Sequence, residues 1–167
     1  MNVIFERRSI RKYTDEPVPI EKLFDFVKAG MSAPSAGNQQ PWHFITITDR
    51  SLLQKIPEFH PHSRMLKDAP AAICVCGDPA LEKHPGFWLQ DCAAATENIL
   101  LEITAQGYGG VWIGVYPVED RISNLRRLLG IPENIVPFCL ISLGRPAERK
   151  EPKDLFRADR VHLEKWA

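Results

Sequence analysis

The chain has 167 residues, of which 44% are hydrophobic and 25% are charged, a composition that suits one globular domain with a sizeable core. Its 21 basic and 21 acidic residues give a formal net charge of zero. Proteins that bind nucleic acid or anionic membranes need a broad basic field, so this balance argues against both kinds of partner. We therefore expect a single domain over residues 1–167.

The chain also lacks the sequence marks of a membrane or secreted protein. No stretch approaches the roughly 18 apolar residues of a membrane span, and the first residues lack the apolar segment of a signal peptide. The four cysteines form no C-x-x-C pair, and Cys74, Cys76 and Cys139 have apolar neighbours. We expect buried free thiols, and the cytoplasm is the expected compartment.

Apolar periodicity predicts helices and strands in alternation. Helices are expected at about residues 19–29, 51–56, 88–106 and 119–129, with Gly30 ending the first. Strands are expected at residues 43–48, 71–77, 109–114 and 138–143. This order predicts an α+β or mixed α/β layout, with helices covering a sheet of about four or five strands. After residue 147 the chain is charged and irregular, with Val161 and Trp166 as its expected anchors.

The segment Arg7-Arg8-Ser9-Ile10-Arg11-Lys12-Tyr13 places four cations, a hydroxyl and an aromatic ring within seven residues. Guanidinium groups bind phosphate in a bidentate manner, so the segment is a candidate anion site. In an extended conformation Arg7, Ser9 and Arg11 would point to one side, with Arg8 and Lys12 on the other. On composition alone, a solvated charged surface explains the segment better.

A polar loop follows at residues 33–42, where two prolines stiffen the backbone. Ser35, Asn38 and Gln40 offer hydrogen-bond donors and acceptors to the edge of a planar heterocycle, and Trp42 offers an apolar wall. An ordinary turn-rich loop is the alternative. The combination of stiffness and polarity slightly favours a functional loop.

Two further segments are ambiguous when they are taken singly. Gly110 and Gly114 flank a short strand and could let a ligand approach the backbone, although a glycine-flanked core strand is the simpler interpretation. Arg145 follows a buried strand, where ligand sites gather, although a surface arginine is the favoured interpretation when the residue is taken alone. The pair His60 and His62 lacks a third ligand of clear spacing, so no metal site is expected. No Ser/His/Asp arrangement, Walker loop or G-x-G-x-x-G motif is present, so no catalytic side chain is expected.

Together these segments resemble the nitroreductase family of FMN-dependent NAD(P)H oxidoreductases. The matching segments are residues 7–13, 34–42, 107–114 and 144–146, which occur in the family's order. The resemblance implies an α+β fold of three layers, α/β/α, around a mostly antiparallel sheet. It also implies an interlocked homodimer with FMN at the subunit interface.

The resemblance further implies which residues contact FMN. Those from one subunit would be Arg7, Arg8, Ser9 and Arg11 at the phosphate, ribityl chain and pyrimidine edge, Trp112, Ile113 and Gly114 along the isoalloxazine, and Arg145 at the phosphate. Those from the partner subunit would be Pro34, Ser35 and Asn38. The chain lacks the lid helices of longer members, so residues 82–88 are the expected local wall of the substrate pocket.

The implied reaction takes a hydride from NADH or NADPH through flavin N5 to an electron acceptor such as a nitroaromatic or a quinone, with ping-pong kinetics. The flavin carries the chemistry, and a cation such as Arg11 would stabilise the reduced flavin anion. Two alternatives stay open at this point. One is a flavin-binding carrier or sensor without turnover, and the other is a protein that binds a phosphate or nucleotide other than a flavin.

Overall fold

The computed structural model describes residues 2–166, so the first and last residues of the expected domain lie outside the described residues. Its centre is a sheet of four strands, β1 (Trp42–Ile47), β2 (Ala71–Gly77), β3 (Gly109–Gly114) and β4 (Val136–Gly144). The strand order is β1-β2-β4-β3, and each neighbouring pair is antiparallel. The predicted antiparallel sheet is confirmed, and β3 lies at one edge.

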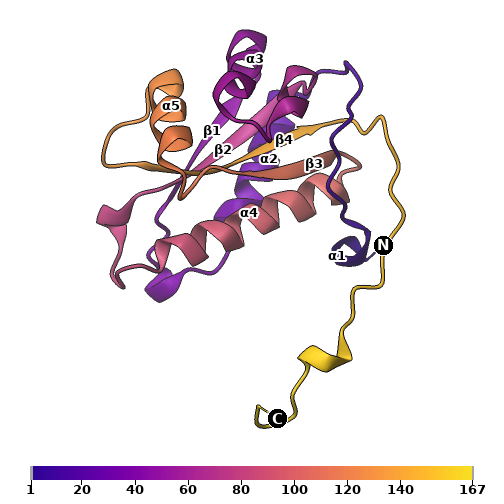
Figure 1. The fold of residues 1–167 in the computed structure, drawn as a ribbon, viewed down its shortest axis with the longest axis vertical. Coiled ribbons are helices and arrows are strands. Elements are labelled where there is room, and N and C mark those ends of the chain that lie inside the picture. Colours follow the sequence, from indigo (N-terminus) through magenta and orange to yellow (C-terminus); the bar gives the residue numbers. More distant parts are fainter. Residues whose placement is uncertain (1, 167) are drawn as a thin grey trace.

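Helices cover both faces of this sheet. They are α1 (Val3–Glu6), α2 (Ile20–Met31), α3 (Arg50–Phe59), α4 (Trp88–Ala105) and α5 (Glu119–Leu129). Figure 1 shows α4 along one face, with α3 and α5 on the opposite face. The expected three-layer α/β/α arrangement is therefore confirmed.

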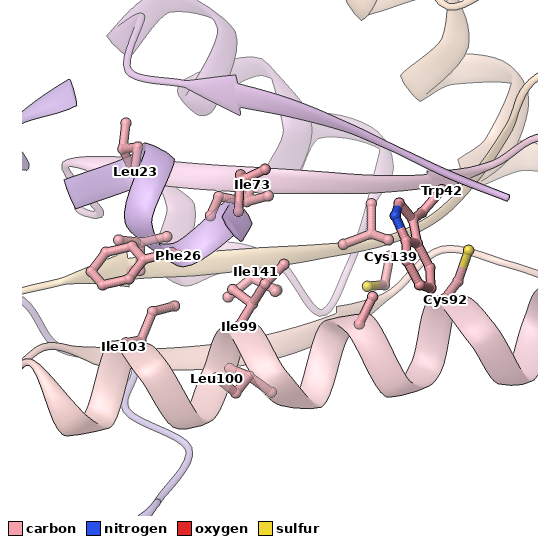
Figure 2. Packing of buried hydrophobic residues seen from close by; sticks show 14 of the residues in the cluster. Leu23, Phe26, Trp42, Ile73, Cys92, Ile99, Leu100, Ile103, Cys139 and Ile141 are labelled. Carbon is pink, nitrogen blue, oxygen red and sulfur yellow. The ribbon is translucent and has the colours of Figure 1, made fainter. Parts of the chain in front are cut away.

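The continuous apolar run of β2 is explained by its central place. Successive side chains of a strand point to opposite faces, so Ile73 packs with α2 and α4 while Cys74 packs with α3 and α5. Both faces are covered, so every residue of β2 is buried. Figure 2 shows the first of these cores, where Phe26 of α2 and Ile99 of α4 meet Ile141 of β4.

The prediction that Gly30 ends the first helix is wrong, because α2 continues through it to Met31. A Cβ at Gly30 would lie 2.9 Å from the Cδ1 and Cγ1 atoms of Ile99 on α4. Glycine is required there by the close approach of two helices, which a reading of local sequence cannot show. The next helix, α3, is longer than expected and contains Pro57 near its end.

The N-terminal segment is bound along the edge of the sheet. Ser9 forms a parallel bridge with Gly110 of β3, and Tyr13 forms an antiparallel bridge with Pro146. The Ile10 amide donates to the Gly110 carbonyl at 3.1 Å. The arginine-rich segment therefore covers the first half of the free edge of β3 and leaves the second half open.

The C-terminal residues leave the body of the molecule and pass close to α1 (Figure 1). Val161 and Trp166 are 56% and 88% exposed, so the expectation that they anchor this tail is wrong within one chain. Leu155 and Phe156 are also exposed, at 74% and 73%. Among the described residues, no helix is both long and apolar enough to cross a membrane.

Replacing Tyr13 with phenylalanine should loosen the N-terminal segment. The Tyr13 hydroxyl donates to the Ile10 carbonyl at 2.6 Å and lies 2.7 Å from the Ser142 hydroxyl. Burial raises the pKa of Tyr13, so the hydroxyl keeps its proton at any physiological pH. Losing it should cost about 1–3 kcal/mol of unfolding free energy, measured in urea. The control Tyr116→Phe removes the hydroxyl of a ring that is 37% exposed and should change little.

Gly109→Ala should displace the same segment by a different route. A Cβ at Gly109 would lie 2.8 Å from the Ile10 Cβ, which is too close to the stem of a β-branched side chain to be relieved by rotation. We expect a loss of about 1–3 kcal/mol and faster amide exchange at residues 7–13. Gly114→Ala is the matched control, because nothing lies within 4 Å of its added Cβ. Equal effects of the two variants would contradict the docking of Ile10 on β3.

Candidate functional site

The arginine-rich segment lines a cleft of about 640 Å³ between the start of the chain and its C-terminal tail. The lining residues from the segment are Arg7, Arg8, Ser9 and Arg11. Arg8 lies on the same cleft as its neighbours, because the short α1 ends at Glu6 and the chain is not a regular strand here. The alternation expected of an extended segment therefore does not separate Arg8 from Arg7, Ser9 and Arg11.

The tail adds two cations to this cleft that the sequence analysis did not single out, Lys150 and Lys153. The Lys150 ammonium donates to the Ser9 carbonyl at 2.5 Å, and the Arg8 Nε donates to the Glu151 carbonyl at 2.9 Å. In the sequence, these two lysines were indicated only by the charged run that follows Arg145. Among the described residues, the cleft therefore gathers five cationic side chains and one carboxylate, that of Glu151.

Arg8 lines this cleft and carries one buried donor that has no partner among the described residues. The Arg8 Nη1 donates to the Arg7 carbonyl at 2.6 Å, but the Arg8 Nη2 has no hydrogen-bond acceptor. A buried guanidinium nitrogen without an acceptor is costly, and an oxyanion is the partner that its geometry favours. Arg7 is less available to bind an anion, because its Nε lies 3.1 Å from a carboxylate oxygen of Glu97.

A second cavity, of about 440 Å³, follows the open half of the β3 edge. It brings together Arg11 and the predicted residues Trp112, Ile113 and Gly114, so Arg11 lines both cavities. Arg64 and Arg121 line it as well, from the turn after α3 and from the first turns of α5. Within residues 2–166, none of these three arginines forms an ion pair, so the cavity has an uncompensated positive field.

The backbone of β3 faces this second cavity with unused polar groups. The Gly110 carbonyl points away from β4, because it accepts from Ile10, and the Gly114 carbonyl also points away, because it accepts from His60 and Arg121. Residues two apart on a strand direct their N–H and C=O groups to the same side. The Trp112 amide and carbonyl therefore face the open edge, where the edge of a planar heterocycle can pair with them.

The proline-flanked loop lies apart from both cavities within one chain. Pro34 and Ser35 line a separate cavity of about 390 Å³ with Phe87 and Asp91. The loop backbone is held in an unusual shape, with Asn38 and Gln40 at φ values of 53° and 47°. A non-glycine residue with positive φ is uncommon, so this loop is built to present a fixed surface.

Two buried side chains fix the loop to its surroundings. The Asp91 carboxylate accepts from the Gln39 side-chain amide at 2.7 Å and from the Ala36 amide at 3.0 Å. The Gln39 carbonyl oxygen in turn accepts from the backbone amides of Lys83 and His84. The structure thus places residues 82–88, the expected pocket wall, directly beside the loop. Gln39 was in the loop motif, but its role as the linking residue depends on Asp91, which lies far away in sequence.

Arg145 is occupied by contacts of its own. Its guanidinium stacks over the Tyr108 ring at 4.0 Å and lies 3.4 Å from the Glu16 carboxylate. It is not among the residues that line the arginine cleft. Its assignment to a phosphate remains a prediction.

The four cysteines are buried and line none of these cavities. Burial raises the pKa of the Cys92 thiol to about 12, so at neutral pH it is a thiol rather than a thiolate. The predicted packing role of the buried thiols is consistent with this position.

Comparison with known proteins agrees with the order of the segments. The nitroreductase family model matches residues 4–60 and 58–145. A protein of Methanothermobacter thermautotrophicus, provisionally named an NADH dehydrogenase/NAD(P)H nitroreductase, is 54% identical over 166 residues, covering 99% of this chain and 87% of its own.

Solved structures share the fold. A protein of Clostridium acetobutylicum, provisionally named an NADH oxidase, superposes with a TM-score of 0.95 at 44% identity, covering 99% of this chain and 100% of that one. A provisionally named nitroreductase from Desulfovibrio desulfuricans, crystallised in complex with FMN, has a TM-score of 0.85 at 28% identity and covers 99% and 96% of the two chains. The sheet, the arginine segment and the open β3 edge all fall within the matched residues, and the chain belongs to the nitroreductase family.

Proposed function

We propose that the protein is an FMN-dependent oxidoreductase that takes a hydride from NADH or NADPH and passes it to an electron acceptor such as a nitroaromatic or a quinone, with ping-pong kinetics. One observation carries the proposal. The cationic cleft and the cavity along β3 meet at Arg11, so a phosphate site adjoins a slot with free backbone hydrogen-bonding groups. FMN has this combination of a phosphate and a planar heterocycle.

The residues present fit that cofactor. The buried Arg8 Nη2 lacks an acceptor that a phosphate oxygen would provide, and Ser9, Lys150 and Lys153 supply further donors in the same cleft. The proposed cofactor-binding residues are therefore the predicted Arg7, Arg8, Ser9, Arg11, Trp112, Ile113 and Gly114, with Lys150, Lys153 and Arg64 added. Bound FMN would supply the hydride-transfer chemistry.

The chain's own residues orient and stabilise rather than react. The Trp112 backbone is placed to pair with the heterocycle, and the field of Arg11, Arg64 and Arg121 favours a negative charge in the cavity. Such a field raises the reduction potential of a flavin, because reduction produces the anion. The cysteine thiols are buried away from the cavities, so the proposal needs no side-chain nucleophile.

A homodimer completes the proposed site. Ile4, Phe5, Leu155 and Phe156 form an exposed apolar surface beside the arginine cleft, around a cavity of about 620 Å³. An apolar surface of this kind suits coverage by a second copy. In that arrangement Pro34, Ser35 and Asn38, whose loop is rigid but remote from the cleft in one chain, reach FMN from the partner subunit.

The visible spectrum tests the proposed function directly. We expect purified protein, or protein reconstituted with FMN, to be yellow, and its flavin to be bleached by NADH or NADPH without oxygen and recovered by a quinone. Colourless protein that cannot be reconstituted would overturn the proposal. Yellow protein that neither nucleotide bleaches would indicate a carrier or sensor, and stabilisation by inorganic phosphate but not by FMN would indicate a different phosphate ligand.

Arg8→Ala should weaken FMN binding most clearly among the cleft arginines, because Arg8 presents the unpartnered nitrogen. Loss of a charge-assisted hydrogen bond costs about 1.5–3 kcal/mol, which is roughly a ten- to hundredfold rise in Kd. Fluorescence titration of FMN into apoprotein measures it. Arg50→Ala is the control, since Arg50 bonds the carbonyls of Lys67 and Ala69 away from the cleft. An unchanged Kd in Arg8→Ala would remove Arg8 from the site.

A further inference from the structure

The last residue of β3 is held from outside the sheet by two side chains. The Gly114 carbonyl accepts from the His60 Nε2 at 2.8 Å and from an Arg121 Nη1 at 3.0 Å. His60 directly follows α3, and Arg121 lies near the start of α5, so two helices of one face converge on a single backbone oxygen. No other β3 carbonyl receives such a pair of side-chain bonds among the described residues.

No side chain packs on Gly114 itself, although its neighbours Ile113 and Val115 are buried. Nothing lies within 4 Å of where a Gly114 Cβ would be, so no side chain presses against that position. Beyond it the strand pairing ends irregularly, because the Val115 and Tyr116 amides both donate to the Phe138 carbonyl, at 3.2 and 3.0 Å. On the open side of β3, the Gly114 peptide group is therefore held by the bonds from His60 and Arg121.

The protonation state of His60 is determined by its surroundings. Its Nδ1 accepts from the His62 backbone amide at 3.3 Å, so the ring proton is on Nε2, where it is donated to Gly114. The ring is 1% exposed, and burial together with the nearby Arg121 lowers its pKa, which favours this neutral form. Arg11, Arg64 and His62 also line the cavity, and its lining within the described part of the chain contains no carboxylate.

We propose that His60 and Arg121 are positioning residues, whose two hydrogen bonds hold the end of β3 so that the Trp112 and Gly114 backbone groups face the cofactor cavity in one orientation. We call these two hydrogen bonds to Gly114 the clamp. The identity of the ligand rests on the proposed function, but the clamp itself does not. Protonation of His60 replaces the Nδ1 lone pair with a second N–H, which removes the acceptor of the His62 amide but leaves the Nε2 donor to Gly114 in place.

Three variants test the clamp through amide exchange at residues 112–116 and through the Kd of FMN. Arg121→Gln and His60→Leu should each speed exchange and raise the Kd by about tenfold at pH 7.5, as expected for one lost hydrogen bond. His60→Leu removes a hydrogen bond without removing a charge at that pH. It therefore separates the effect of the hydrogen bond on the Kd from the effect of the positive field. His60→Gln keeps a donor where Nε2 lies, so it should retain the wild-type exchange and Kd at pH 7.5.

The matched control is Arg127→Gln, because Arg127 is an exposed arginine of the same helix and lines neither cavity. Wild-type exchange and Kd in Arg121→Gln would overturn the proposal, even if His60→Leu fails to fold. A wild-type protein that binds no FMN would remove the proposed function instead. Amide exchange would then still decide the clamp, since it needs no ligand.

Discussion

The pairing of residues 9–13 along the edge of the sheet is the constraint on which the site depends. Ser9 forms a bridge with Gly110 of β3, and Tyr13 forms one with Pro146, just after β4. The Tyr13 hydroxyl bonds to the Ile10 carbonyl and to Ser142 inside the core. These buried bonds fix the backbone between Arg8, which is partly buried, and Arg11, which is exposed. A cationic segment of a neutral chain thereby becomes a defined wall instead of a solvated tail.

The edge position of β3 explains why a site forms here. An edge strand leaves N–H and C=O groups unpaired, and proteins usually cover or block them. Here the N-terminal segment covers the first half of the edge, and the Gly114 carbonyl is capped by His60 and Arg121. The groups of Trp112 between these two blocks remain available, beside three arginines that form no ion pair within residues 2–166. The free backbone groups of Trp112 and the positive field of the arginines thus occur at the same place.

The loop at residues 33–42 keeps a fixed shape despite an unfavourable backbone conformation. Positive φ angles at Asn38 and Gln40 are unfavourable, and the buried Gln39–Asp91 pair compensates by satisfying backbone amides of two segments. A loop so fixed can contribute to a site formed with another copy, because its shape does not depend on the ligand. The exposed apolar residues near the cleft suit the same assembly.

Local sequence determined the elements and most of the chemistry of this protein. Alternation and periodicity gave the sheet and the main helices, and the spacing of residues 7–13, 34–42 and 107–114 indicated the family, because these signals are carried by neighbouring residues. Only the tertiary structure decided the rest. Gly30 serves contact with Ile99, Lys150 and Lys153 join the arginine cleft, and His60 and Arg121 meet at Gly114. Each depends on elements distant in sequence approaching in space, which no local pattern encodes.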